Sequence, residues 1–297
     1  MTTIQVNVVR AFVEQGGEGG NPAGVVLDLE GRLSAAERLA VAAKAGFSET
    51  AFVSPSQACD YRLEFFTPTR QIPHCGHATI GTFGVLAQQG LVKGPNSSKE
   101  TVDGPRRIIL DGSRAFMEQR APKYRLATEY GLTTEAIMSA IGLTTADLLE
   151  GTVPELVNTG NGFLIIGVKD QAALRKIKPN LPAIAEMTKT LDDAVAFYVF
   201  APSSVRPGRH ATARMFGPGY GIPEEAATGM AAGPLAAYLY DRLGVRQETL
   251  LIEQGYFMDE PSPSIIEVRL TLVDGKIQGL MAGGAAAVEK VLNIEIA

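Results

Sequence analysis

Phe66–Pro73, with the sequence FTPTRQIP, has a second copy in the chain at Phe216–Pro223, with the sequence FGPGYGIP. The two segments share Phe, Pro, Ile and Pro at four matching places, always 150 residues apart. Because a repeated segment indicates a repeated structural unit, this spacing predicts two domains of similar fold. The alternative is a chance match in a chain that contains 17 prolines.

The segments around the two copies follow the same order. Upstream of each copy a Gly-Asn turn leads into an apolar run, at Gly20-Asn21 and at Gly160-Asn161. Downstream of each copy lies a stretch rich in small residues, 78–89 and 229–239, which is predicted to be helical. This shared order favours the repeat over the chance match.

The first half contains a helix with clear end markers. Ser34-Ala-Ala-Glu37 is a capping box, and Gly46 can end the helix in a left-handed conformation, so a helix is predicted over 35–45. Residues 47–53 begin as a turn and continue as a strand. Glu49 is therefore expected at a helix-to-strand junction.

Strands are predicted over 62–66 and 211–216, directly before the two proline-containing loops. The helices that follow are expected to begin near Gly76-His77-Ala78 and near Ala227-Thr228-Gly229. A helix N-terminus presents backbone N–H groups and a partial positive charge, so each can bind a carboxylate or an enolate-like oxygen. The small residues at both places would allow close approach of a ligand, although tight helix packing would also explain them.

The composition supports two soluble domains. The chain has 297 residues, 45% of them hydrophobic, and a formal charge of −5 from 27 Lys+Arg and 32 Asp+Glu. Single cores tend to split beyond about 250–300 residues, so we expect domains at 1–125 and 126–297, with the tail 284–297 packing back on the first. The acidic balance disfavours nucleic acid as a partner. No apolar run is long enough for a membrane helix and no leader is recognisable, which predicts a cytoplasmic protein.

Cysteine and histidine are scarce. Cys59 and Cys75 cannot form a disulfide framework, and both are expected to be reduced thiols. A metal site would have to combine His74, Cys75 and His77 in one short segment, without a further pair to complete it. No metal is therefore predicted.

Four residues near the helix starts are candidates for proton transfer. Glu49 is flanked by apolar residues, and such surroundings raise the pKa of a carboxyl group, although a solvated strand-end glutamate is the alternative. Cys75 could be a thiolate that abstracts a proton, but its counterpart region, 225–227, has no thiol, so a two-thiol mechanism is impossible. Glu224 and Glu225 can stabilise the second helix dipole or take part in catalysis.

The combined motifs resemble the PhzF-like family of phenazine biosynthesis, which has the diaminopimelate epimerase-like fold. The resemblance covers nearly the whole chain and lies in the segments Gly20–Val25, Ser48–Val53, Phe65–Pro68, His74–Thr79, Glu224–Leu235, Gln254-Gly255 and Gly283-Gly284. It implies an α+β protein of two pseudo-symmetric domains, each a mixed sheet curled around a central helix, with an active site in the cleft between them. It also implies a cofactor-independent isomerase that forms a homodimer and acts on a small anionic metabolite.

The resemblance also assigns roles to residues. Glu49 corresponds to the acid that moves the proton, and His77 and Glu225 to the other catalytic residues. The substrate-binding positions are Asn21, Cys75, Gly76, Thr228, Gly229 and Met230. The phenazine enzyme has Asp, Pro and Ser where this chain has Glu225, Ala226 and Met230, and such changes alter substrate choice.

The leading hypothesis is therefore an isomerase in which Glu49 moves a proton on a small anionic metabolite, an amino or hydroxy acid that can be cyclic. Two alternatives remain open. One is a racemase or epimerase that uses Cys75 and Glu49 as opposing groups, and the other is a metabolite-binding protein that has lost the chemistry.

Overall fold

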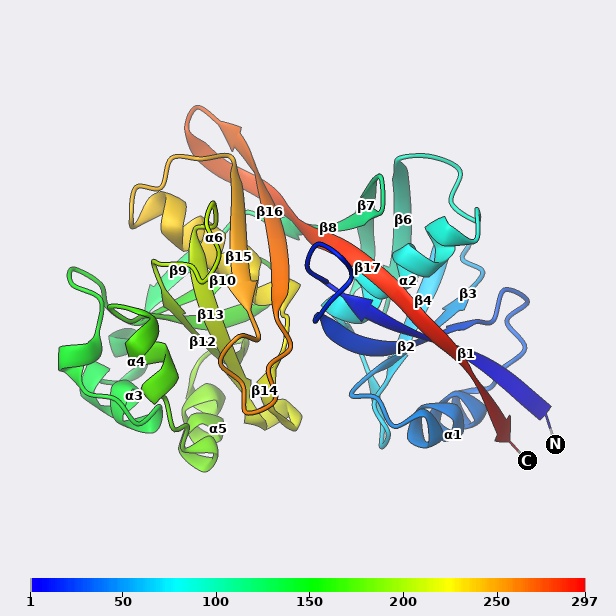
Figure 1. Ribbon diagram of the computed structural model, residues 1–297, viewed down its shortest axis with the longest axis horizontal. Helices are drawn as coiled ribbons and strands as arrows, with labels where there is room; N and C mark the ends of the chain where they lie inside the picture. The colour runs from blue at the N-terminus through cyan, green and yellow to red at the C-terminus, as the bar shows by residue number, and fades with distance from the viewer. Residues whose placement is uncertain (1, 297) are drawn as a thin grey trace. The chain divides into compact units, whose positions relative to one another are not determined.

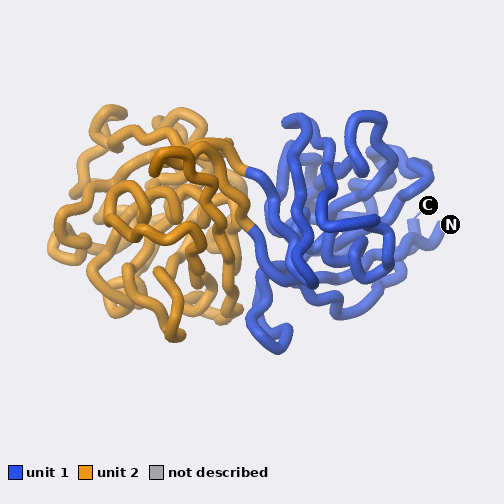
Figure 2. The backbone as a smooth tube through the Cα atoms, turned by 90° about the horizontal axis from the view of Figure 1, so that it is seen from above, with its two compact units in different colours: residues 1–118, 283–297 blue, residues 119–282 orange. Residues whose placement is uncertain are grey.

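The computed structural model describes residues 2–296 and divides them into two compact units (Figure 2). Unit 1 contains residues 2–118 and 283–296, and unit 2 contains residues 119–282. The chain leaves unit 1 inside strand β8 (Arg114–Arg120) and returns to it inside strand β17 (Lys276–Ile296). The last part of β17 belongs to unit 1 because it pairs antiparallel with β1 (Thr2–Ala11).

Unit 1 is a mixed sheet with two helices (Figure 1). Its remaining elements are β2 (Asn21–Leu27), α1 (Ala35–Ala45), β3 (Thr50–Ser54), β4 (Tyr61–Phe66), β5 (Gln71–Ile72), α2 (Gly76–Gln88), β6 (Asn96–Thr101) and β7 (Gly104–Asp111). Helix α1 connects the parallel pair β2 and β3, and helix α2 connects the parallel pair β4 and β6. Each helix is thus the crossover of a βαβ unit, which parallel pairing requires.

Unit 2 repeats this plan with extra short helices. Its elements are β9 (Lys123–Leu126), η1 (Ala127–Tyr130), α3 (Thr134–Ala140), η2 (Thr145–Asp147), β10 (Glu155–Asn158), β11 (Gly162–Gly167), α4 (Gln171–Lys176), α5 (Leu181–Thr190), β12 (Ala194–Ala201), β13 (Ala211–Gly217), η3 (Pro218–Tyr220), β14 (Ile222–Glu225), α6 (Gly229–Asp241), β15 (Thr249–Gln254) and β16 (Ser264–Val273). The parallel pairs are β11 with β12 and β13 with β15, and α6 connects the second pair.

The repeat that the sequence predicted is visible in the strand pairing. In unit 1, β4 runs parallel to β6 with Tyr61 opposite Lys99. In unit 2, β13 runs parallel to β15 with Ala211, 150 residues after Tyr61, opposite Ile252. The predicted helix over 35–45 is confirmed as α1, with both capping-box bonds of Ser34 and Glu37.

Helices α2 and α6 are the central helices of their units. Each has 13 residues, and side chains around most of the circumference are buried. A helix that is apolar on all sides must be surrounded by other elements, and α2 contacts β1, β2 and β3 while α6 contacts β10, β11, β15 and β16. Each unit is therefore a mixed sheet curled around one helix, as predicted.

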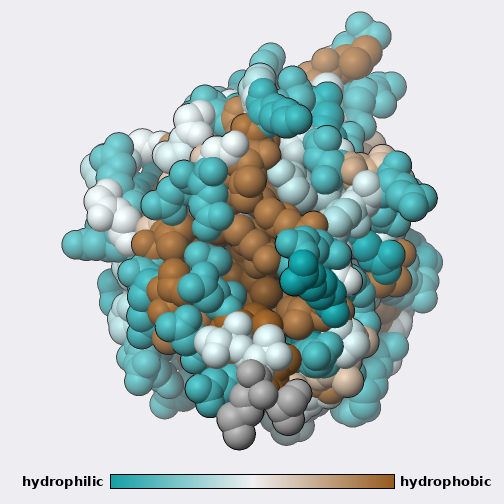
Figure 3. Space-filling view, turned by 90° about the vertical axis from the view of Figure 1, so that its right-hand side faces the viewer, coloured by the Kyte–Doolittle hydropathy of each residue, from teal (hydrophilic) through white to brown (hydrophobic). Residues whose placement is uncertain are grey.

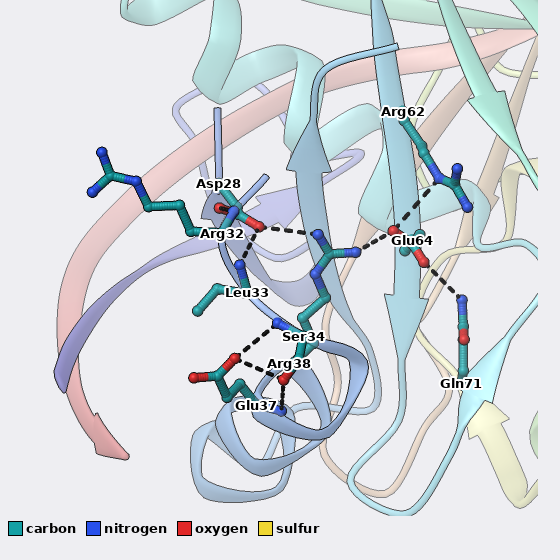
Figure 4. A network of polar contacts seen from close by, with 9 residues as sticks. All are labelled: Asp28, Arg32, Leu33, Ser34, Glu37, Arg38, Arg62, Glu64 and Gln71. Atoms are coloured by element: carbon teal, nitrogen blue, oxygen red, sulfur yellow. Dashed lines mark hydrogen bonds and ion pairs between the residues drawn. The ribbon is translucent and has the colours of Figure 1, made fainter. Parts of the chain in front are cut away.

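Helix α1 is held in unit 1 by a network of buried charges (Figure 4). Arg38 is 7% exposed, and its guanidinium pairs with Asp28 at 3.0 Å and also with Glu64 of β4. Asp28 accepts two further bonds from the backbone N–H groups of Arg32 and Leu33. Removing one partner of a buried ion pair costs about 3–5 kcal/mol, so this network holds α1 firmly in place. Glu49 follows α1 in the chain, and its position depends on this helix.

One side of unit 1 carries a continuous apolar stripe (Figure 3). Apolar side chains of this unit that remain partly exposed include Ile4, Leu33, Leu292 and Ile294, which pack on the core beneath α1. Apolar patches of this kind are common at subunit interfaces. The expected homodimer stays a prediction, which light scattering on the purified protein would check.

Among residues 2–296, no helix combines the length and the apolar character that crossing a membrane requires.

Candidate active site

The N-terminal end of α2, residues Cys75–Ala78, forms what we call the α2 mouth. Cys75 is the N-cap residue in an extended conformation (φ −144°, ψ 123°), and its side chain makes no capping hydrogen bond. The helix starts at Gly76, as predicted, and His77 is its second residue. Because the first N–H groups of a helix have no intrahelical acceptor, this end can receive an anionic group.

Glu49 lies directly before β3, at the helix-to-strand junction that the sequence predicted. Its backbone C=O accepts a hydrogen bond from the Gly24 N–H at 3.1 Å, which fixes the residue against β2. The side chain is only 5% exposed, and its Oε2 atom makes no hydrogen bond within the part of the chain that the structure describes. The alternative of a solvated strand-end glutamate is therefore wrong.

Three predicted site residues come together at the α2 mouth. His77 Nε2 lies 3.4 Å from Glu49 Oε2, and His77 Nδ1 lies 3.6 Å from Cys75 Sγ. One N, one S and one O atom of the three side chains lie within 4.8 Å of one another, and all three residues are buried. The imidazole of His77 thus stands between a thiol and a carboxylate.

This cluster has the donor types of a metal site. Within residues 2–296 it is the one group of three His, Cys, Asp or Glu side chains close enough to share an ion. However, the two ring nitrogens of His77 face different partners, so the atoms form a chain of contacts rather than converging on one point. The expectation of no metal stays a prediction.

Burial keeps the thiol of Cys75 protonated. It raises the pKa of Cys75, and the neighbouring His77 lowers it to a smaller extent. Both Cys59 and Cys75 are free thiols, in agreement with the sequence. A neutral Cys75 at neutral pH leaves Glu49 as the acidic side chain of this cluster.

Beneath the α2 mouth lies a residue that the sequence analysis missed. Lys99 of β6 is completely buried, and its Nζ lies 2.7 Å from Thr79 Oγ1 and 3.3 Å from His74 Nδ1. In the sequence, Lys99 belongs to the polar run Ser97-Ser-Lys-Glu-Thr101, where nothing indicates burial. The sequence marked His74 only as a possible metal ligand and as part of a family motif.

The corresponding end of α6, Thr228-Gly229 with the preceding Glu225, is the α6 mouth. Helix α6 starts at Gly229, as predicted, with Thr228 as its N-cap residue. The Thr228 hydroxyl donates to the carboxylate of Glu225, which is half-buried at the end of β14. This hydrogen bond holds Glu225, the acid that the sequence predicted directly before the second helix, α6.

A buried amide, Gln254 of β15, holds the α6 mouth in place. Its Oε1 accepts from the Tyr198 hydroxyl at 2.9 Å and from the Thr228 N–H at 3.0 Å. Its Nε2 donates to the Glu225 backbone C=O at 2.7 Å and to Thr228 Oγ1 at 3.0 Å. The sequence marked Gln254 only as part of a family motif, and Tyr198 not at all.

The remaining candidate residues, Asn21, Met230 and Glu224, lie outside the contacts described so far. Asn21 begins β2, is 5% exposed and lies opposite Ala11 of β1. Met230 is the second residue of α6 and is half-buried. Glu224 forms a two-bond ion pair with Arg214, at 2.7 and 2.8 Å, which ties β14 to β13.

Known proteins resemble this chain over nearly its full length. Residues 9–291 match the model of the PhzC-PhzF family of phenazine biosynthesis-like proteins. An uncharacterized isomerase of Deinococcus radiodurans is 36% identical over 292 residues, 95% of this chain and 92% of the relative. The crystal structure of a PhzF-family phenazine biosynthesis protein of Bacillus anthracis superimposes with a TM-score of 0.89 at 28% identity, covering 100% of both chains.

These matches define an α+β protein with the diaminopimelate epimerase-like fold, as predicted. The chain belongs to the PhzC-PhzF family, and it is an enzyme of the isomerase class. A member with a named reaction, the trans-2,3-dihydro-3-hydroxyanthranilate isomerase of Pseudomonas aeruginosa, is 32% identical over 244 residues, 78% of each chain.

Proposed function

We propose that this isomerase moves a proton on a small anionic metabolite without a cofactor, and that Glu49 removes and returns the proton. The observation that supports this is the Glu49 carboxylate itself. It is buried, one of its oxygens makes no hydrogen bond, and it faces His77 at the N-terminal end of a buried helix. A general base needs a free oxygen within reach of the proton that it abstracts, and Glu49 offers one.

The α2 mouth would stabilise the negative charge that forms when the proton leaves. Backbone N–H groups at a helix N-terminus are fixed donors, and such preorganised donors are typically the largest contribution to stabilising an enolate-like transition state. His77, which contacts both Glu49 and Cys75, would keep the carboxylate oriented toward the substrate.

The same geometry argues against a racemase that uses Cys75 and Glu49 as opposing bases. Two such bases must lie on opposite sides of one carbon, each about 3–3.5 Å from it, which requires a separation of about 6–7 Å. The Cys75 sulfur and a Glu49 oxygen are instead within 4.8 Å of each other. Cys75 and Glu49 are therefore too close together to act from opposite sides of one carbon atom, and both can face only one side of a substrate.

The substrate of the Pseudomonas aeruginosa relative, trans-2,3-dihydro-3-hydroxyanthranilate, is the first compound to test. We expect a different preferred substrate, because Glu225, Ala226 and Met230 replace the residues that the resemblance leads one to expect. A change of one methylene or one hydroxyl in a binding site alters substrate preference by about 10-fold or more.

The test is proton exchange in deuterated water. The protein is incubated with this compound and with a panel of small cyclic and linear amino and hydroxy acids, and carbon-bound deuterium is followed by mass spectrometry. We expect one compound to gain deuterium with the wild type and with Glu150→Gln, an exposed matched control. Exchange by Glu49→Gln at the wild-type rate would refute the proposal.

A further inference from the structure

Lys99 occupies a core position of unit 1. The strand pairing places Lys99 opposite Tyr61, and in the repeated unit the position opposite Ala211 is Ile252, which is completely buried. Unit 1 thus has a lysine where the same architecture in unit 2 has an isoleucine. Burying a lysine costs far more free energy than burying an isoleucine, so this substitution calls for an explanation.

The ammonium group has only neutral partners. Nζ lies 2.7 Å from Thr79 Oγ1 and 3.3 Å from His74 Nδ1, and it lies 5.1 Å from the centre of the Phe65 ring. Within residues 2–296, no carboxylate pairs with it. Three neutral groups can support a charged amine, but they do not neutralise it.

The position of Lys99 relative to α2 adds a second cost. Thr79 belongs to the first turn of α2 and also donates to the Cys75 backbone C=O at 2.6 Å, while His74 directly precedes Cys75. The amine therefore lies at the positive end of the helix dipole, where a cation is unfavourable and an anion is favourable. The Glu49 carboxylate is not among the charges that act on this amine, whereas a negative charge at the Cys75 position would offset both costs.

The electrostatics of the buried amine agree with this geometry. Burial lowers the pKa of Lys99 to about 7, a negative charge on Cys75 raises it, Arg106 lowers it and Asp103 raises it. Burial and the charge of Lys99 also lower the pKa of His74 well below its usual value, so His74 is neutral. Lys99 can therefore gain or lose its proton near neutral pH, and a nearby anion favours the charged form.

We propose that Lys99 is the counter-charge of an anion site at the α2 mouth and takes up a proton when an anionic group of the ligand binds there. A buried polar atom beside the amine, His74 Nε2, has no hydrogen-bond partner, and because His74 Nδ1 faces the Lys99 ammonium, Nε2 can carry the hydrogen that an anionic group accepts. The inference rests on the proposed function in taking the ligand to be an anionic metabolite. Binding is then strongest below pH 7 and weakens as the pH rises above it.

A carboxylate built into the protein can replace the unidentified ligand. Cys75→Asp places a negative charge at the N-cap of α2, a position that favours Asp, and Cys75→Asn is its neutral match. The ionisation of Lys99 is followed by NMR of isotopically labelled lysine, with the signal assigned by its loss in Lys99→Met. We expect a midpoint near 7 in the wild type and in Cys75→Asn, and a midpoint at least about one pH unit higher in Cys75→Asp.

A second measurement uses the wild-type chain and so does not depend on the folding of a variant. The lysine spectra are recorded with acetate, a small carboxylate, or with acetamide, its neutral match, at equal ionic strength. The same rise of about one unit is expected with acetate only. An ordinary lysine midpoint near ~10.4 in the wild type, or equal midpoints with the charged and the neutral compound, would overturn the inference.

This result is separable from the proposed function. If Glu49→Gln retained proton exchange but Lys99 responded to the carboxylate, the anion site would stand and the role of Glu49 would fall. If Glu49→Gln lost exchange but Lys99 did not respond, the isomerase mechanism would stand without Lys99.

Discussion

At the α6 mouth a single buried amide satisfies the hydrogen bonds of its neighbours, whereas at the α2 mouth two buried polar atoms lack a hydrogen-bond partner. Gln254 uses both N–H groups and both lone pairs to hold Glu225, Thr228 and Tyr198. Around α2, Glu49 Oε2 and His74 Nε2 make no hydrogen bonds, and Lys99 lacks an opposite charge. The two mouths come from one repeated plan, yet the polar groups of one are held in a complete hydrogen-bond network and those of the other are not.

Unsatisfied buried groups destabilise a fold, so they persist where function requires them. This contrast suggests that the repeat allowed a division of roles. One copy of the helix end keeps its acid, Glu225, in a fixed hydrogen-bond network, and the other holds Glu49, the acid to which we assign the proton transfer. Substitutions at one mouth at a time test whether this difference is real.

The largest effect on stability is expected at the α6 mouth. Gln254→Leu leaves the Tyr198 hydroxyl, the Thr228 N–H and the Glu225 C=O without their partner, and each buried unsatisfied group costs about 1–3 kcal/mol. We expect the free energy of unfolding to fall by about 3–5 kcal/mol, as measured by chemical denaturation. Gln278→Leu, the same change at an exposed position, should have little effect. A small loss in Gln254→Leu would mean that water or repacking replaces the network.

At the α2 mouth we expect a substitution to raise the free energy of unfolding rather than to lower it. Lys99 has a pKa of about 7 in the folded protein and the ordinary lysine value of 10.5 in the unfolded chain, so unfolding takes up a proton between these pH values. The destabilisation by Lys99 is therefore full below pH 7 and disappears as the pH rises toward 10.5. Lys99→Met should raise the free energy of unfolding by about 2–4 kcal/mol at pH 7 and progressively less at higher pH.

Denaturation curves of the wild type and Lys99→Met over this pH range would check the prediction. Lys93→Met, at an exposed position of the same unit, is the matched control and should change neither the stability nor its pH dependence. If Lys99→Met were less stable than the wild type at every pH, Lys99 would be a structural residue and the contrast between the mouths would weaken.

The smallest effect is expected from the hydroxyl that holds Glu225. Thr228→Val keeps the shape of the side chain but removes the bonds to Glu225 and from Gln254. A loss of about 1–2 kcal/mol is expected in thermal or chemical unfolding. An unchanged stability would show that Glu225 does not depend on this bond for its position.

The sequence predicted the backbone at both mouths better than the side chains that surround them. The 150-residue repeat, the capping box at Ser34 and the small residues at the helix starts are local patterns, and α1, α2 and α6 begin where these patterns placed them. Glu49 was placed correctly at its junction, because a helix end followed by an apolar run determines it. The family resemblance correctly implied the fold and the isomerase class.

Lys99 and Gln254 could not be predicted, because their roles depend on which strands become neighbours. A lysine in the polar run of β6 looks exposed until β6 is placed parallel to β4 beside α2. Gln254 acts through residues up to 56 positions away, such as Tyr198. The sequence contained one clue, the equivalence of Lys99 and Ile252, but this required the register of both strand pairs.

The most direct test of the contrast compares the two acids in one assay. Deuterium incorporation into the compound found with the wild type is measured for Glu49→Gln and Glu225→Gln. We predict that Glu49→Gln lowers the exchange rate by about 10²–10⁴-fold, the usual contribution of a general base, while Glu225→Gln slows turnover but still exchanges protons. If Glu49→Gln exchanged at the wild-type rate, or if only Glu225→Gln lost exchange, the assignment of the chemistry to the α2 mouth would be contradicted.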